Sequence, residues 1–277
     1  MSARQSLAIG LRAVLCLTFL LVAAFLFFHE VTARFVWQNY QWARAALWLN
    51  QSQVPLAQEI GNYYFGGGDY NIPLARRAFT QAAALDPAAP WNNYQLARIC
   101  LVGDQWLCAL RHINRELEIN PKNLRALYVR GLIYGYRKNY VRAAQDFSDF
   151  IAWAPTEWAG YNDLAWVEGK LGNYATMQSA AERGIATGDA GATNPWLWNS
   201  RGVAALNLKD HETARASFER ARELAEGLNE LDWRIAYPGN DPASAAVGLN
   251  EFRKAIEKNL AAANAPVDNG QRDNPAP

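Results

Sequence analysis

The chain has 277 residues and a formal net charge of +1 at pH 7, with 27 lysines and arginines against 26 aspartates and glutamates. Because nucleic-acid binding normally requires a clustered basic surface, this balance argues against a nucleic-acid partner. The aromatic and alanine-rich segments repeat with a helical period and no run alternates as a strand would, so the sequence predicts an all-α protein.

The first predicted element is an apolar stretch from Leu7 to Phe28 with a single charge, Arg12. A helix of about 20 apolar residues can cross the roughly 30 Å hydrocarbon layer of a membrane. Arg4 and Arg12 lie on its N-terminal side without an acid, whereas Glu30 follows the stretch. This charge bias predicts a single-pass membrane protein with a cytoplasmic N-terminus and the rest of the chain outside the cytoplasm.

A cleaved secretory signal is the alternative for residues 1–33. Val31-Thr32-Ala33 offers small residues at a possible cleavage site after the apolar run. Cleavage there would release a secreted, soluble protein. We expect the uncleaved anchor, because the apolar run is long for a signal peptide.

Residues 34–53 form a segment rich in aromatic side chains, with Trp37, Tyr40, Trp42 and Trp48. Such residues favour the membrane–water interface, so the segment could continue the anchor as a juxtamembrane helix. It could equally cover the end of the domain that follows, and we favour this capping role.

A period of 34 residues organises the middle of the chain. Pro87, Pro121 and Pro155 are spaced by this interval, and each closes an apolar segment. The stretch from Leu124 to Pro155 contains two amphipathic segments separated by a polar hinge at 137–139. Two such helices form a hairpin with an apolar face on each, which must be buried against similar neighbours.

Small and large residues alternate at fixed intervals in this unit, at Gly131, Tyr134, Ala143, Phe147 and Pro155. At these positions the unit resembles the small–large signature of the tetratricopeptide repeat family. Small residues at Gly131 and Ala143 allow two helix axes to approach, while Tyr134 and Phe147 fill the remaining space. The proline then ends the second helix.

Four further units carry the signature, two of them more weakly, so the resemblance covers residues 54–226 in about five units. The signature residues of these units are Ile60, Gly61, Tyr64, Ala75, Phe79, Ala82 and Pro87; Leu96, Ala97, Ala109, Ile113 and Pro121; Tyr161, Leu164, Ala165, Met177 and Ala181; and Trp198, Gly202, Ala214, Phe218 and Ala221. The resemblance implies an α-solenoid in which each hairpin packs on its neighbours.

The C-terminal part is predicted to cap the solenoid. The turn Pro238–Pro242 breaks the helical pattern, and residues 243–263 regain it with an apolar stripe that suits the last repeat. We therefore expect a C-terminal cap over residues 227–263. Residues 264–277 contain no packing residue, which predicts a disordered tail.

No motif for chemistry is present. The sequence lacks the nucleophile, zinc-protease and phosphate-loop patterns, so we expect neither an enzyme nor a cofactor. Cys100 and Cys108 lie on either side of a predicted turn, and their pattern, without a histidine partner, predicts no metal site. They could form a disulfide outside the cytoplasm or serve as small core residues.

The resemblance implies that the first helix of each hairpin lines a concave, partner-binding face. Its outward positions mix aromatic rings with arginine and asparagine, which suits an extended peptide; the tryptophans could instead pack between hairpins. The predicted partner-binding residues are Asn62, Trp91, Tyr94, Arg98, Arg125, Tyr128, Asn162, Trp166, Trp196 and Asn199.

The carboxylate-clamp subtype of the family is a poor match. Asn62 and Arg125 fit its positions loosely, but Gln58, Gln95 and Val129 replace the others. We therefore predict a membrane-anchored scaffold that binds protein partners in the cell envelope, with an oligomeric state that the sequence leaves open. The alternative is a glycan-binding accessory of envelope polysaccharide assembly, whose aromatic rings would stack on sugars.

Overall fold

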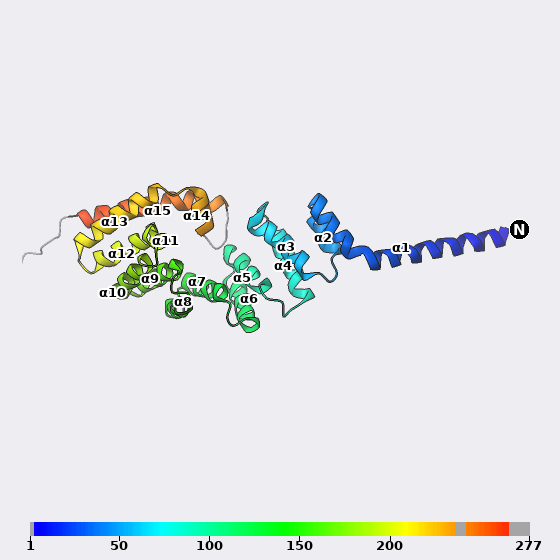
Figure 1. Ribbon diagram of the computed structural model, residues 1–277, viewed down its shortest axis with the longest axis horizontal. Coiled ribbons are helices and arrows are strands. Elements are labelled where there is room, and N and C mark those ends of the chain that lie inside the picture. The colour runs from blue at the N-terminus through cyan, green and yellow to red at the C-terminus, as the bar shows by residue number, and fades with distance from the viewer. Residues whose placement is uncertain (1–2, 237–241, 266–277) are drawn as a thin grey trace, which may run out of the picture.

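The computed structural model describes residues 3–236 and 242–265, and every regular element in these ranges is a helix (Figure 1). The predicted all-α class is thus confirmed. The elements are α1 (Ala3–Tyr40), α2 (Ala43–Leu49), α3 (Val54–Asn62), η1 (Tyr63–Gly67), α4 (Ile72–Leu85), α5 (Asn92–Val102), α6 (Trp106–Ile119), α7 (Leu124–Tyr136), α8 (Tyr140–Trp153), α9 (Trp158–Leu171), α10 (Tyr174–Ile185), α11 (Asp189–Ala192), α12 (Pro195–Asn207), α13 (His211–Glu226), α14 (Glu230–Ala236) and α15 (Pro242–Asn264).

Helices α3 to α13 form five successive hairpins. The pairs are α3/α4, α5/α6, α7/α8, α9/α10 and α12/α13, and the second helix of each pair packs on the first helix of the next. We call the first member of each pair its A helix and the second its B helix. This arrangement is the predicted solenoid, in which stability comes from contacts within and between neighbouring hairpins.

Three hairpins share one glycine–phenylalanine contact at the crossing of their two helices. A Cβ atom built on Gly131 would lie 2.7 Å from the Phe147 ring, and one on Gly202 would lie 2.5 Å from Phe218. Gly61 has the same relation to Phe79, again at 2.7 Å. All three phenylalanines are almost fully buried. The small–large pattern therefore sets how closely the helices approach, as the sequence predicts.

Short polar caps explain where several helices begin. Asn71, Asn123 and Asn194 each accept a hydrogen bond from the backbone N–H three residues later, at the starts of α4, α7 and α12. Such caps satisfy a backbone donor that the helix itself leaves unpaired. The local sequence thus fixes the boundaries that the 34-residue period only suggests.

The predicted membrane-spanning helix is not found. Among the residues that the structure describes, no helix combines the length and the apolar character needed to cross a membrane. α1 is long, at 38 residues, and after Phe28 it continues without a break through His29, Glu30 and Arg34. The predicted single-pass topology, with an extracytoplasmic repeat domain, is therefore wrong.

The end of α1 and helix α2 pack on the first hairpin, while the beginning of α1 extends away from the molecule (Figure 1). Trp37 and Leu47 are buried in one cluster with Ile60 and Phe79. Trp37 also donates a hydrogen bond from Nε1 to Glu59 Oε1, 2.7 Å away. Residues 34–53 thus cover the open face of the first hairpin; the domain boundaries themselves stay predictions.

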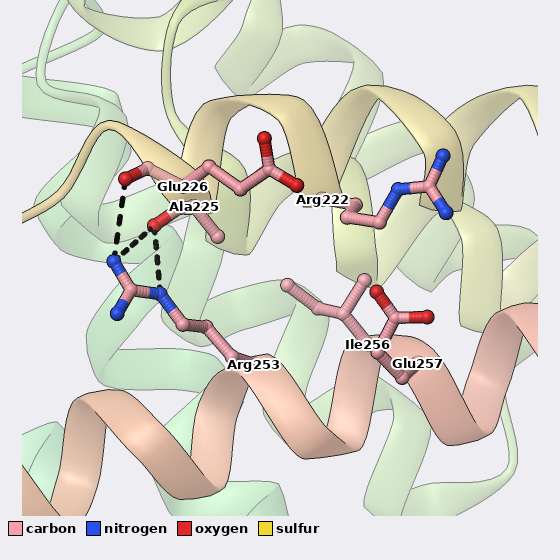
Figure 2. A pocket seen from close by; sticks show the side chains of 6 residues that line it. All are labelled: Arg222, Ala225, Glu226, Arg253, Ile256 and Glu257. Carbon is pink, nitrogen blue, oxygen red and sulfur yellow. Dashed lines mark hydrogen bonds between the residues drawn. The ribbon is translucent and has the colours of Figure 1, made fainter.

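Helix α15 lies on α13 at the other end of the solenoid (Figure 1). Ile256 packs on Ala221 and Ala225. The guanidinium of Arg253 donates to the carbonyl oxygens of Ala225 and Glu226 at the end of α13, as Figure 2 shows. The predicted turn at 238–242, except for Pro242, and the predicted tail after 265 lie outside the described residues.

Candidate functional site

A pocket of about 580 Å³ opens between the A helices α5 and α7 and the start of α9. Four of the ten predicted partner-binding residues meet here: Tyr94 and Arg98 from α5, and Arg125 and Tyr128 from α7. The remaining lining residues are Leu124, Phe150, Ala154, Glu157 and Ala159. The pocket therefore combines aromatic rings, two arginines and one acid.

Arg98 is held at the pocket by aromatic neighbours. Its guanidinium carbon lies 4.8 Å from the centre of the Phe65 ring and 5.6 Å from that of Tyr94. Its Nη1 donates to Gln95 Oε1 at 3.0 Å. Burial lowers the pKa of Arg98, and the positive charge of Arg125 lowers it further. Two positive charges of the pocket thus repel each other, a situation that a bound anion would relieve.

Tyr128 joins α7 to α9 beneath the pocket. Its hydroxyl donates a hydrogen bond to Asp163 Oδ2, and Asn162 Nδ2 donates to Asp163 Oδ1 at 3.1 Å. Burial raises the pKa of Asp163 to about 6, although both hydrogen bonds act in the opposite direction. Burial and the charge of Asp163 raise the pKa of Tyr128 well above its usual value. The phenol is therefore neutral and fixed in orientation.

Tyr94 is positioned by a buried carboxylate from the B helix of its own hairpin. Glu116 is fully buried, and its two oxygens accept the backbone N–H groups of Trp91, at 2.9 Å, and Tyr94, at 3.2 Å. Asn123 Nδ2 also donates to Glu116, at 3.0 Å. Glu116, although it belongs to α6, thus caps the N-terminus of α5. At that end the helix has N–H donors without a partner inside the helix, and the helix dipole favours a negative charge.

The other predicted asparagines make contacts within the chain. Asn62 Oδ1 accepts a hydrogen bond from Gln95, and Asn199 Oδ1 accepts one from Asn259 of α15, both at 3.0 Å. Asn162 bonds to Asp163 as described. These residues link neighbouring A helices, or the last A helix to α15, along the row that includes the pocket.

The three predicted tryptophans differ in their surroundings. Trp91 is exposed and meets Tyr94 edge-on, with ring centres 5.6 Å apart. Trp166 lies against the ring of Tyr136, 5.5 Å away, between neighbouring hairpins. Trp196 stacks on Phe252 of α15 at 5.5 Å. Of the three tryptophans, Trp91 alone is exposed, with 42% of its surface accessible.

Sequence reasoning missed Phe65, Asp163 and Glu157 as members or supports of the site. For Asp163 the sequence holds a partial signal: Tyr128 and Asn162 are one period of 34 apart and Asp163 is the next residue, but the period does not say which of the two neighbours reaches Tyr128. Phe65 comes from the wide turn η1, whose shape the repeat pattern does not encode. Glu157 precedes α9 and carries no sequence signal.

A second cluster lies in the hairpin α5/α6. Cys100 and Cys108 form a disulfide that links the two helices, so the disulfide alternative is the one the structure contains. A ring nitrogen of His112 and both sulfur atoms lie within 4.8 Å of one another. The structure thus places a histidine beside the two cysteines, which their own spacing did not indicate. That they form no metal site stays a prediction. The missed signal is the spacing of Cys108 and His112, four residues apart on one helix face.

Five stacked helix hairpins with this small–large packing define an α-solenoid of the tetratricopeptide-repeat fold. A structure of MamA, residues 41 to the end, from Desulfovibrio magneticus RS-1 matches it with a TM-score of 0.57 and 18% identity, covering 64% of this chain and 97% of that one. A tetratricopeptide repeat protein from Parabacteroides merdae ATCC 43184 matches with a TM-score of 0.51 and 16% identity over 83% and 81% of the two chains. At these identities the likeness establishes the fold alone.

One curated relative is similar in sequence. Sperm-associated antigen 1 of Rattus norvegicus is 31% identical over 114 residues, which are 41% of this chain and only 12% of that protein. No protein-family model matches the chain.

Proposed function

We propose that this protein is a scaffold that binds an extended segment of a partner protein along its A helices, with the pocket at Tyr94, Arg98, Arg125 and Tyr128 as the main contact. The observation that carries the proposal is the pocket itself, which gathers rings and guanidinium groups from two successive hairpins. Tyrosine and arginine are enriched at the energetic centres of protein interfaces. The function is binding, without a reaction of its own.

The pocket is built to keep its shape before a partner arrives. Tyr94 is held through Glu116, Tyr128 through Asp163, and Arg98 through Gln95 and Phe65. Side chains that are already ordered lose little conformational entropy on binding, which favours affinity. Arg125 is the exposed member of the set and can adjust to the partner.

The charge of the pocket favours an acidic side chain of the partner segment. Arg98 and Arg125 face a single lining acid, Glu157. In the described part of the chain Arg125 makes no ion pair, so its charge is available for a carboxylate. Charge-assisted hydrogen bonds from arginine to carboxylate are among the strongest in proteins. We therefore propose an acidic residue seated over these two arginines.

A glycan is the less favoured ligand. Sugar binding would need several aromatic faces free for stacking, whereas the ring of Trp166 packs against Tyr136 and that of Trp196 against Phe252. Both tryptophans are thus engaged in holding the solenoid together. The rings left at the pocket are mainly tyrosines.

Probing an array of extended peptides with the full chain tests the proposal. We expect selected peptides whose capture is lost in Tyr94→Ala and Arg125→Ala, retained in the remote exposed variant Arg215→Ala, and unaffected by an excess of soluble oligosaccharides. Competition by the oligosaccharides, or equal capture by all variants, would refute a peptide-binding pocket. Far-UV circular dichroism shows whether each variant is folded.

A further inference from the structure

Cys100, Cys108 and His112 form a cluster, and none of the three lines the proposed partner-binding pocket. Cys100 lies near the end of α5 and Cys108 near the start of α6. The two helices are connected by only three residues, 103–105. This short link and the packing of the two helices hold the sulfur atoms together. His112 is one turn further along α6, on the same face as Cys108.

The three side chains are the ligand types that bind thiophilic metal ions. Two thiolates and one imidazole suit Zn²⁺, which takes Cys and His ligands in a tetrahedral arrangement. With metal–ligand distances of about 2.0 to 2.3 Å, ligand atoms of such a site lie roughly 3.5 Å apart. The two sulfur atoms and a His112 nitrogen already lie within 4.8 Å of one another. Small side-chain movements would therefore bring the three ligand atoms to the distances that a bound metal ion requires.

Neighbouring residues favour the forms of these side chains that bind metal. Asn93 Oδ1 lies 3.0 Å from Nδ1 of His112. Because an amide oxygen only accepts, Nδ1 carries the proton and Nε2 keeps its lone pair, as in many metal-binding histidines.

Arg76 contacts the sulfur atom of Cys100. Its Nη1 donates to Cys100 Sγ at 3.5 Å, and its Nη2 donates to Gln105 Oε1 at 3.2 Å. Once the disulfide is reduced, a guanidinium at this position favours the thiolate, which is the form that ligates a metal. The cluster thus includes two sulfur atoms and one imidazole, with Asn93 and Arg76 in contact with them.

We propose that reduction of the Cys100–Cys108 disulfide opens a binding site for a thiophilic divalent cation, with both sulfur atoms and His112 as ligands. A dithiol reductant supplies two electrons and two protons, becoming a disulfide itself, and leaves two thiols. Zn²⁺ then displaces the two thiol protons and binds the two thiolates and the imidazole nitrogen. A fourth ligand position stays open to water, since the cluster has three protein ligands.

The test uses the full chain with the exposed Cys16 replaced, Cys16→Ser, so that no other cysteine contributes. The protein is reduced with a phosphine, freed of it without oxygen, and titrated with Co²⁺, whose thiolate complexes give a charge-transfer absorption band. We expect saturation at one Co²⁺ per chain, displacement by Zn²⁺, and no band from the oxidised chain. Cys108→Ser should abolish the band.

The decisive comparison is between two histidine variants. His112→Gln should weaken Co²⁺ binding at least tenfold, whereas His211→Gln, in another hairpin, should leave it unchanged. Circular dichroism without metal checks that the fold is intact. The absence of a band in the reduced chain, or equal affinities of the two histidine variants, would overturn the proposal; equal affinities would indicate adventitious binding to thiols.

Discussion

The hydroxyl of Tyr128 on α7 donates a hydrogen bond to the carboxylate of Asp163 on α9, and so joins two successive hairpins beneath the candidate binding pocket. The pairing explains why Tyr128 presents its ring in one orientation. It also places an ionisable group with a raised pKa inside the solenoid. The stability of the protein should depend on pH through this group.

Asp163 makes the folded state more stable as the pH falls towards 4. Burial raises its pKa from 3.8 to about 6. Between these values the folded state binds a proton that the unfolded state does not, so the free energy of unfolding decreases as the pH rises through this window and this contribution is constant above it. We expect a change of about 3 kcal/mol from this group.

Urea unfolding of the natural chain and of Asp163→Asn, which cannot ionise, isolates this contribution. The difference between their unfolding free energies should change with pH between about 4 and 6 and stay constant above that range. The exposed variant Ser148→Ala, which removes no ionisable group, should show no such change. A pH-independent difference between natural chain and Asp163→Asn would contradict the raised pKa.

Replacing Glu116 should destabilise the hairpin that supplies Tyr94 and Arg98. Glu116→Ala leaves the N–H groups of Trp91 and Tyr94 without their buried acceptor. We expect a loss of about 2–4 kcal/mol, because these hydrogen bonds involve a charged acceptor and the donors stay buried. Glu118→Ala, on the exposed face of the same helix, should cost less than about 0.5 kcal/mol. Similar unfolding midpoints for both variants would show that Glu116 is not a cap.

Gly131→Ala tests the crossing of α7 and α8. The new Cβ would lie 2.7 Å from the Phe147 ring, so the hairpin must open slightly. We expect a loss of about 1–3 kcal/mol, partly regained in the double variant Gly131→Ala/Phe147→Leu, where the smaller side chain makes room. A Cβ atom on Gly227 would lie 3.5 Å from Leu224 O, which is ordinary contact, so Gly227→Ala should hardly change the stability. Thermal unfolding of the natural chain, of the single variants Gly131→Ala and Phe147→Leu and of their double variant provides the comparison, with Gly227→Ala as the control. Strictly additive effects of the two single changes would rule out direct crowding.

Arg253 should stabilise the C-terminal end of the solenoid. Its guanidinium donates hydrogen bonds to the last carbonyl groups of α13 (Figure 2). It also donates one to the carbonyl oxygen of Leu228. Arg253→Ala would remove these charge-assisted hydrogen bonds, and we expect a loss of about 1–3 kcal/mol. Lys254→Ala removes only an exposed ion pair with Glu251 and should change little. Hydrogen exchange of the last turn of α13 should accelerate in the first variant only.

Most of the fold could be predicted from the 34-residue repeat period. Gly131 and Phe147, spaced as the family signature requires, meet as expected, and residues 34 apart such as Tyr128 and Asn162 come to lie on adjacent A helices. Period alone does not say which neighbour of Asn162 reaches Tyr128, since that depends on helix rotation. This is why Asp163 was missed.

Contacts between segments outside the period could not be foreseen. The partners of Trp196 and Asn199 come from α15, whose position along the solenoid no repeat spacing fixes. The anchor prediction used a local run of apolar residues and ignored that the helix continues well beyond it. Likewise, His112 lies beside the cysteines only because residues four apart share one face of a helix. A search of the sequence for metal-binding motifs does not take this geometry into account.

The most direct test of the account is the affinity of the full chain for a peptide selected on the array, measured by fluorescence anisotropy, in Arg125→Glu and in the exposed hinge variant Arg137→Glu. We predict that Arg125→Glu weakens binding at least tenfold, that replacing the acidic residue of the peptide by lysine partly restores it, and that Arg137→Glu has no effect. Equal affinities of the two charge-reversed proteins would contradict the proposed pocket.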